Sequence, residues 1–223
     1  MKRLFAFLML GFFSLADGFS DDYLNFTVGF PFGYHFQDGD YELEYLDEKN
    51  DPVIVISDGF NLQFCVDFRF TAEYFHSFGE SSFGLGAKVG ASRGVMMGEF
   101  YDFLADFDST GFLFAPGIGW VFGETTKKKI NIYPCLFQYY KLTNGETGDE
   151  CDGNKNVKLP DSSVFALRTG ASFSWQWGSK FQNGFELGFN VDWCNWMKFG
   201  DCDVVSGGSG IEFYLAYKFS IGL

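Results

Sequence analysis

Histidine is scarce in this 223-residue chain, which restricts the acid–base and metal chemistry that the sequence can support. His35 and His76 are the two histidines, and the strand order expected from the sequence puts them at opposite ends of one fold. We therefore expect no histidine-based metal site and no cofactor. A lipid-modifying enzyme that uses His35 with Ser or Asp at a rim is a remote alternative, and otherwise the chain is expected not to be an enzyme.

Three other features of the sequence could form a binding site or a cross-link. The stretch GLGAKVG (84–90) faintly resembles a dinucleotide loop, but its glycines alternate within a strand and no helix follows. The stretch DECDGNKN (149–156) offers oxygen ligands for a loose cation site, although such acidic loops are usually just solvated, and no metal is predicted. In oxidising surroundings Cys151 and Cys202 can form a disulfide between two loops, with five free thiols as the alternative.

Charged residues recur on the glycine-rich face of strands whose other face is apolar. They are predicted to line a narrow lumen: Asp67, Arg69, Glu73, Lys88, Arg168, Glu186, Asp192, Glu212 and Lys218. Five acids against four bases at close quarters should pair and obstruct the lumen, because an unpaired buried charge is costly. We expect Arg168 to lie opposite Asp192, and Asp67, Arg69 and Lys88 to form a similar cluster.

The elements that must position these charges are eight alternating segments. Bulky apolar side chains fall on one face, and glycine or polar residues on the other, in residues 24–36, 60–72, 83–92, 112–122, 130–140, 165–177, 185–193 and 211–223. Each is close to the 9–11 residues of a tilted transmembrane strand. A soluble barrel has the reverse polarity. The sequence therefore predicts an all-β fold, an eight-stranded antiparallel up-and-down transmembrane β-barrel.

The N-terminus has the pattern of a secretory signal peptide. Lys2 and Arg3 precede the apolar run LFAFLMLGFF, and Ser14-Leu15-Ala16 supplies small residues for cleavage. An apolar run of this length is short for a membrane-spanning helix, which needs about 20 residues. We expect residues 1–16 to be removed and residues 17–223 to form the barrel.

Connection lengths and charge give an orientation. Long connections (37–59, 93–111, 141–164 and 194–210) alternate with short ones, so the long ones are predicted to be external loops and both termini to be periplasmic. YELEYL and PVIVIS flank DEKND, which suggests that the acidic first hairpin continues beyond the membrane. The net charge of −13 argues against nucleic-acid binding.

Aromatic residues mark the expected membrane boundaries. Trp120, Trp175, Trp177 and Trp193 fall at strand ends, as an interfacial girdle requires. In the stretch EFYDFLADF (99–107), the residues Phe100, Phe103, Leu104 and Phe107 follow a helical i, i+3, i+4, i+7 spacing. This stripe is predicted to be a short amphipathic helix that either caps the barrel mouth, where it could contact solutes, or lies on the membrane surface.

These patterns resemble those of small eight-stranded outer-membrane proteins of the OmpA-transmembrane, OmpX and OmpW kind. The last strand, YLAYKFSIGL, is similar to their terminal assembly signal, although it ends on Leu223 and not on an aromatic residue. The Phe-rich, Cys-containing composition and long first loop resemble OmpW-like proteins of spirochaetes. The resemblance implies a monomeric, porin-like barrel that crosses the outer membrane of a diderm bacterium many times and is inserted by the barrel assembly machinery.

Two functions are expected from this resemblance. The first is a narrow or gated route for small, mainly hydrophobic solutes. The alternative is a structural or adhesive surface protein that acts through its acidic external loops, toward host or surface ligands that the sequence does not identify.

Overall fold

The structure, a computed structural model, describes most of the chain after residue 21. The described residues are 22–46, 52–78, 82–100, 103–123, 126–147, 158–159, 161–199, 202–206 and 210–223. The predicted signal peptide and Cys151 lie outside them. Among the described residues, no helix has the length and apolar character needed to cross a membrane.

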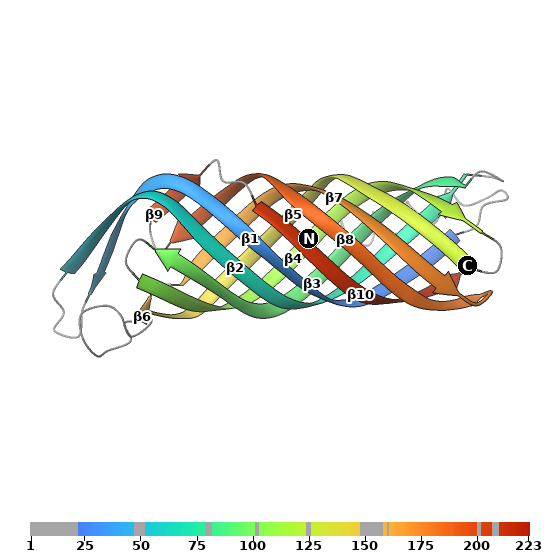
Figure 1. Ribbon diagram of the computed structural model, residues 1–223, viewed down its shortest axis with the longest axis horizontal. Coiled ribbons are helices and arrows are strands. Elements are labelled where there is room, and N and C mark those ends of the chain that lie inside the picture. The colour runs from blue at the N-terminus through green and yellow to red at the C-terminus, as the bar shows by residue number, and fades with distance from the viewer. Residues whose placement is uncertain are drawn as a thin grey trace, which may run out of the picture.

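Eight long antiparallel strands close into a barrel (Figure 1). They are β1 (Asp22–Leu46), β2 (Pro52–Ser77), β3 (Phe83–Phe100), β4 (Phe103–Phe122), β5 (Thr126–Thr147), β7 (Ser162–Trp177), β8 (Phe181–Phe199) and β10 (Gly210–Gly222). Strand β10 closes the ring, since it pairs with β1 on one side and β8 on the other. The short strands β6 (Lys158–Leu159) and β9 (Cys202–Ser206) add to β5 and β8. The predicted fold is confirmed.

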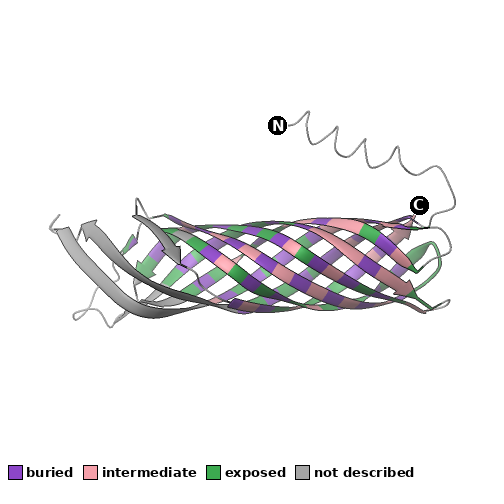
Figure 2. Cartoon of the chain, turned by 90° about the horizontal axis from the view of Figure 1, so that it is seen from above, coloured by how far each residue is buried: buried purple, intermediate pink, exposed green. Residues whose placement is uncertain are grey.

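Burial alternates along the strands, as Figure 2 shows, because successive side chains point to opposite faces. In β7 every second residue from Ser162 to Gln176 is buried. The outward positions are bulky and exposed, with Phe30 at 61% and Phe112 at 58%. An apolar surface of this extent would be unstable in water and suits lipid.

The two ends of the barrel differ. At one end, here called the turn end, β7 and β8 are joined through Gly178, whose φ of +114° is a conformation that favours glycine. Both described termini meet there, since the Leu223 amide donates to the Asp22 carbonyl (2.9 Å). At the other end, here called the hairpin end, β1 and β2 stay paired up to Leu46 and Pro52. The first hairpin therefore continues as its sequence suggested.

The predicted short helix at residues 99–107 is wrong. These residues lie in the β3–β4 hairpin apart from residues 101–102, which lie outside the described part, and Met96 pairs with Phe107. Phe107 is 2% exposed and faces the interior. The side chains of Phe100, Phe103 and Leu104 lie outside the described part. Pairing with neighbouring strands overrides the helical spacing of a short apolar stripe.

Strand β5 carries a second correction. Strict alternation predicted Cys135 inside and Leu136 outside, but Leu136 is 3% exposed and Cys135 is only half-buried. The β5–β7 register shifts between Tyr133 and Leu136. The irregularity at Pro134 and Cys135 reverses the facing of the residues from Leu136 to Leu142, as a β-bulge does.

Candidate functional site

The barrel interior holds the candidate site. All nine charged residues predicted for the lumen are buried, each 6% exposed or less. The structure adds Lys129, which is 3% exposed. With it the interior contains five acids and five bases. They form two groups along the barrel, named here the lysine cluster (Glu73, Lys88, Lys129, Glu186, Lys218) and the arginine cluster (Asp67, Arg69, Arg168, Asp192, Glu212).

Glu73 is one centre of the lysine cluster, nearer the turn end. Its carboxylate accepts hydrogen bonds from Lys129 (3.0 Å) and Tyr133 (3.1 Å), and the Lys218 ammonium lies 3.8 Å away. The amides of Asn25 (2.8 Å) and Asn131 (3.2 Å) also donate to it. Hydrogen bonds of this number stabilise the ionised carboxylate in the interior.

Glu186 is the second centre of the lysine cluster. It accepts from Lys88 (2.7 Å) on one oxygen and from Lys218 (2.8 Å) on the other. Tyr214 also donates to it (3.0 Å). The Lys88 ammonium lies 4.7 Å from the centroid of the Tyr133 ring, so its charge meets an aromatic face as well as a carboxylate.

The arginine cluster is centred on Glu212, nearer the hairpin end. Arg69 holds both its oxygens in a bidentate pair (2.7 and 2.8 Å), and Arg168 adds a third contact (3.0 Å). Asn190 donates to it as well (2.7 Å). Arg168 also contacts Asp192, with 2.5 Å between Nε and Oδ1. Planar guanidinium groups suit this shared geometry.

The predicted pairings have different outcomes. Arg168 lies opposite Asp192 in the β7–β8 register and pairs with it, so that prediction is confirmed. Asp67 and Arg69 belong to one cluster, with 3.9 Å between their charged atoms. Lys88 was wrongly grouped with them. Its ammonium reaches across the lumen to Glu186, because a closed barrel brings strands together that are not sheet neighbours.

Lys129 was missed because the predicted strand began one residue later, at Ile130. Extending the alternation by one residue would have placed Lys129 on the inner face. Its ammonium lies 3.7 Å from the centroid of the Phe75 ring, which is 1% exposed. With Lys129 included, the predicted five acids against four bases become five acids against five bases.

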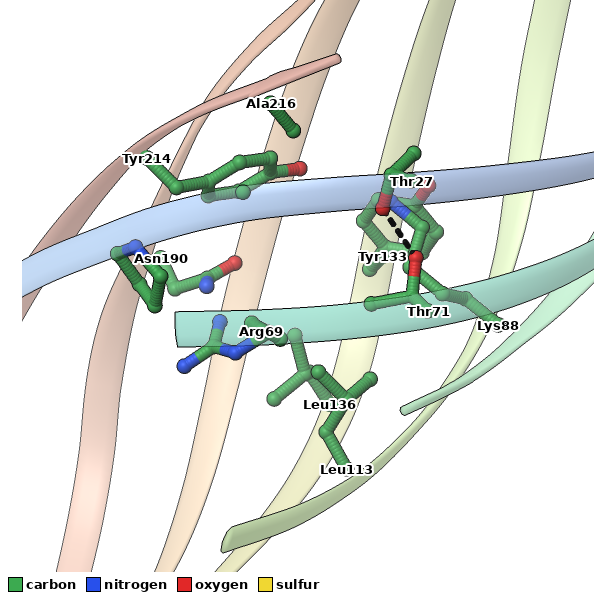
Figure 3. A pocket seen from close by; sticks show the side chains of 12 residues that line it. Thr27, Arg69, Thr71, Lys88, Leu113, Tyr133, Leu136, Asn190, Tyr214 and Ala216 are labelled. Atoms are coloured by element: carbon green, nitrogen blue, oxygen red, sulfur yellow. Dashed lines mark hydrogen bonds between the residues drawn. The ribbon is translucent and has the colours of Figure 1, made fainter. Parts of the chain in front are cut away.

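A small cavity lies between the two clusters (Figure 3). It has a volume of about 20 Å3, enough for one water molecule. Arg69 and Asn190 line it from the arginine cluster, and Lys88 and Tyr214 from the lysine cluster. The hydroxyls of Thr27 and Thr71 form a hydrogen bond beside it (2.5 Å). Side chains therefore nearly fill the middle of the lumen, as eight strands allow.

Toward the hairpin end the interior becomes apolar. Met96 and Phe107 pair across β3 and β4, and Leu142, Leu159 and Val164 are 7% exposed or less. A Cβ on Gly145 would touch the Phe107 ring, so this glycine makes room for it. Buried apolar side chains, with the polar Ser162 and Asn195 among them, therefore line the interior between the arginine cluster and the hairpin end.

The tryptophans of the predicted girdle are half-buried or exposed on the barrel. Trp177 is 49% exposed and Trp193 is 64% exposed, while Trp120 and Trp175 are half-buried. Trp120 pairs with Phe83 near the turn end. Their place relative to a membrane stays a prediction.

The described residues form no cluster of metal ligands. Among them, no three His, Cys, Asp or Glu side chains come together as a metal site would require. The described histidine, His76, pairs with Asp22 at the turn end (2.7 Å). The side chains of His35 and Cys202 lie outside the described part, so the rim enzyme and the disulfide stay untested expectations.

No family model and no curated protein matches the sequence. Among solved structures, the attachment invasion locus protein Ail of Yersinia pestis shares 11% identity, over 90% of this chain and 99% of that chain, with a TM-score of 0.43. The outer membrane protein OprG of Pseudomonas aeruginosa shares 7% identity, over 92% and 98%, with a TM-score of 0.49. Neisserial surface protein A shares 8%, over 89% and 97%, with a TM-score of 0.40.

At these identities the likenesses say nothing of activity, and the OmpW-like subgroup stays a prediction. The architecture itself is explicit. Eight antiparallel strands close without a free edge, the interior is charged, and the outer face is apolar. By these features the chain is a small eight-stranded β-barrel of the outer-membrane type.

Proposed function

We propose that this protein is an outer-membrane barrel with a closed lumen that acts through the surface it presents outside the cell. The observation that carries the proposal is the interior of ten mutually paired charges with a cavity of about 20 Å3 between them. Removing Glu186 would leave the buried ammonium groups of Lys88 and Lys218 without the carboxylate that both contact, so the network favours one fixed packing. Both termini lie in the periplasm, and the barrel assembly machinery inserts the chain as a monomer.

The β1–β2 ribbon is the surface through which such a barrel would contact partners outside the cell. Pairing of β1 with β10 ends at His35, and pairing of β2 with β3 ends at Gln63. Beyond these residues β1 and β2 pair with each other up to Leu46 and Pro52. The described part of this ribbon carries Asp38, Asp40, Glu42, Glu44 and Asp58, and the intervening sequence adds Asp47, Glu48 and Asp51 against Lys49. A strongly acidic projection favours basic partners.

Planar-bilayer recording tests the closed lumen. The wild-type barrel is expected to give no stepwise conductance, whereas the double variant Arg69→Ala/Glu212→Ala should give measurable steps, because it empties the centre of the arginine cluster. A matched control is Glu146→Gln, an exposed position on β5. Stable conductance steps in the wild type would overturn the closed-lumen proposal.

A second candidate, a gated route for small apolar solutes, rests on Tyr214. This side chain lines the central cavity, and it also lines an outer groove of about 690 Å3 bounded by Phe32, Phe173, Leu187 and Leu215. Its partner in β8 is Gly188, where any Cβ would collide with the Tyr214 ring. Tyr214 thus separates the lumen from the apolar outer face at a place where the wall has no side chain.

Uptake into liposomes distinguishes the two candidates. A gated route predicts that Tyr214→Ala accelerates entry of an apolar dye severalfold while sugars of several hundred daltons stay excluded. If Tyr214→Ala leaves entry of the dye at the protein-free rate, the second candidate fails and the closed barrel stands.

A further inference from the structure

One charged side chain interrupts the apolar outer face of the barrel. Arg93 points outward from β3 and is exposed. The neighbouring outward residues of β3 are apolar on both sides of it, with Ala91 toward the turn end and Val95 (42% exposed) and Met97 (40% exposed) toward the hairpin end. A cation on a lipid-facing surface is costly, and residues of this kind commonly mark a functional site.

Strand register extends this cation into a polar track. Arg93 on β3 pairs with Thr110 on β4, and Thr110 pairs with Lys141 on β5. Lys141 pairs with Ser163 on β7, which pairs with Lys198 on β8. Thr110, Lys141 and Lys198 are exposed and Ser163 is half-buried, and alternation turns them all outward. Cations therefore alternate with hydroxyls along one line across five strands.

The spacing within this track suits one phosphate between two cations. Neighbouring strands lie about 4.8 Å apart, so Arg93 and Lys141 stand about 10 Å apart with Thr110 between them. Arginine and lysine side chains are long enough to converge over the threonine hydroxyl. A guanidinium binds phosphate oxygens bidentately and a lysine adds a point charge.

The rows on either side of the track define which molecule fits. The next row toward the turn end is aromatic, with Phe112 paired to Tyr139, Tyr139 to Phe165, and Phe165 to Trp196. On the hairpin side, the outward residues of β4 and β5 include acids, with Asp106 opposite Glu146, while those of β3 are apolar. A ligand with a phosphate above an apolar tail matches this order, and a phosphate alone does not use the aromatic row.

Acidic neighbours leave the cations available. Lys141 lies 3.6 Å from Asp161, but both side chains are more than half exposed, and such surface pairs are weak. Asp108 is the acid diagonal to Arg93, and it accepts a hydrogen bond from Asn144 (2.8 Å). An anionic headgroup therefore faces two cations without having to break a buried pair.

We propose that Arg93, Thr110 and Lys141 bind the phosphate of an anionic membrane lipid, whose acyl chains pack on the aromatic row. This proposal rests on the barrel's lying in a membrane, as argued above. The site would hold a lipid of the leaflet at the hairpin end and fix the depth of β3 to β5 in the bilayer.

Native mass spectrometry of the detergent-purified barrel tests the site, with phosphatidylglycerol as the probe and phosphatidylcholine as its neutral-headgroup counterpart. Each lost cation in Arg93→Gln or Lys141→Gln should weaken phosphatidylglycerol binding about fivefold. Arg93→Lys should restore part of it. The matched control is Lys180→Gln, an exposed lysine at the turn end. Retained heat-dependent gel mobility shows that each variant is folded.

Three results would overturn the proposal. The first is unchanged phosphatidylglycerol binding in Arg93→Gln, which would leave Arg93 as a partner of Asp108 only. The second is an equal loss in Lys180→Gln, which would indicate general charge attraction. The third is displacement of the lipid by inorganic phosphate at equal concentration, which would show a free-anion site. A barrel that binds the lipid in detergent but fails to insert into vesicles would instead count against the proposed function.

Discussion

The lysine cluster and the arginine cluster stabilise buried carboxylates with different kinds of contact. In the arginine cluster, one carboxylate, Glu212, receives a bidentate fork from Arg69 and a further contact from Arg168. In the lysine cluster, the point charges of Lys88 and Lys218 meet on opposite oxygens of Glu186. A guanidinium group that contacts both oxygens fixes the orientation of the carboxylate, whereas an ammonium group can be shared between two carboxylates.

The clusters also carry surplus charges of opposite sign. Three bases face two acids in the lysine cluster, and two bases face three acids in the arginine cluster. The interior balances only when both are counted together, and Lys88 and Arg69 line the cavity between them. The comparison therefore separates two kinds of residue, those at the centre of a cluster and those that supply its surplus.

The largest effect is expected from Glu186→Gln. Lys88 and Lys218 would lose the carboxylate they contact at 2.7 and 2.8 Å, and Glu73 would face three ammonium groups alone. Breaking a buried pair in this way costs about 3–5 kcal/mol. Urea unfolding in lipid vesicles, followed by tryptophan fluorescence, measures it against the exposed control Glu146→Gln. A loss below about 1 kcal/mol would show that water already reaches the lysine cluster.

Glu212→Gln is expected to lose less stability than Glu186→Gln, although Glu212 receives more contacts. Arg168 keeps Asp192 (2.5 Å) and Arg69 keeps Asp67 at 3.9 Å, and the surplus negative charge disappears. What is lost is charge-assisted hydrogen bonding, worth about 1.5–3 kcal/mol. If this variant unfolds more readily than Glu186→Gln, the number of contacts and not the charge balance ranks the two clusters.

Arg168→Lys tests whether fork geometry matters in the arginine cluster. One ammonium cannot reproduce the contacts of Arg168 with Asp192, Glu212 and Gln138 at once. We expect a loss of about 1–2 kcal/mol in the same unfolding measurement, near one charged hydrogen bond. Lys180→Arg, an exposed change at the turn end, is the control. If the free energy of unfolding of Arg168→Lys equals that of the wild type, charge alone stabilises this cluster.

The sequence was sufficient for the fold because alternation is a local property. Arg168 and Asp192 lie on neighbouring strands joined by a short turn, so their pairing follows from counting residues. The partner of Lys88 could not be counted in this way. Glu186 lies on a strand far along the ring, and their contact depends on the diameter of the closed barrel and on the side-chain volumes inside it.

The errors share a different cause, which is local irregularity. A bulge at Pro134 and Cys135 turned Leu136 inward, and a predicted strand that began one residue late hid Lys129. The apolar stripe ending at Phe107 fits a helix and a strand about equally over so few residues, and pairing with β3 decided it. Each of these features depends on neighbouring strands, which periodicity does not report.

The smallest effects are expected where surplus charge is removed, in Lys129→Met and Asp67→Asn. Glu73 would keep its donors Asn25, Asn131 and Tyr133, and methionine can still pack on the Phe75 ring. Asp67→Asn keeps an acceptor for Ser109 (2.8 Å). Each change should cost about 1 kcal/mol or less, because each leaves its own cluster neutral.

The double variant Lys129→Met/Asp67→Asn decides whether the two surpluses stabilise each other across the cavity. If they do, each single change strands the opposite surplus, whereas the double change leaves both clusters neutral. The double variant should then lose less stability than the sum of the two single losses, by about 1 kcal/mol, which is the order of a Coulomb interaction at an effective dielectric constant of about 20. A double-mutant cycle in the same urea measurement gives this difference. Additivity within about 0.5 kcal/mol would show that each cluster balances its own charge and that the even count across the lumen is incidental.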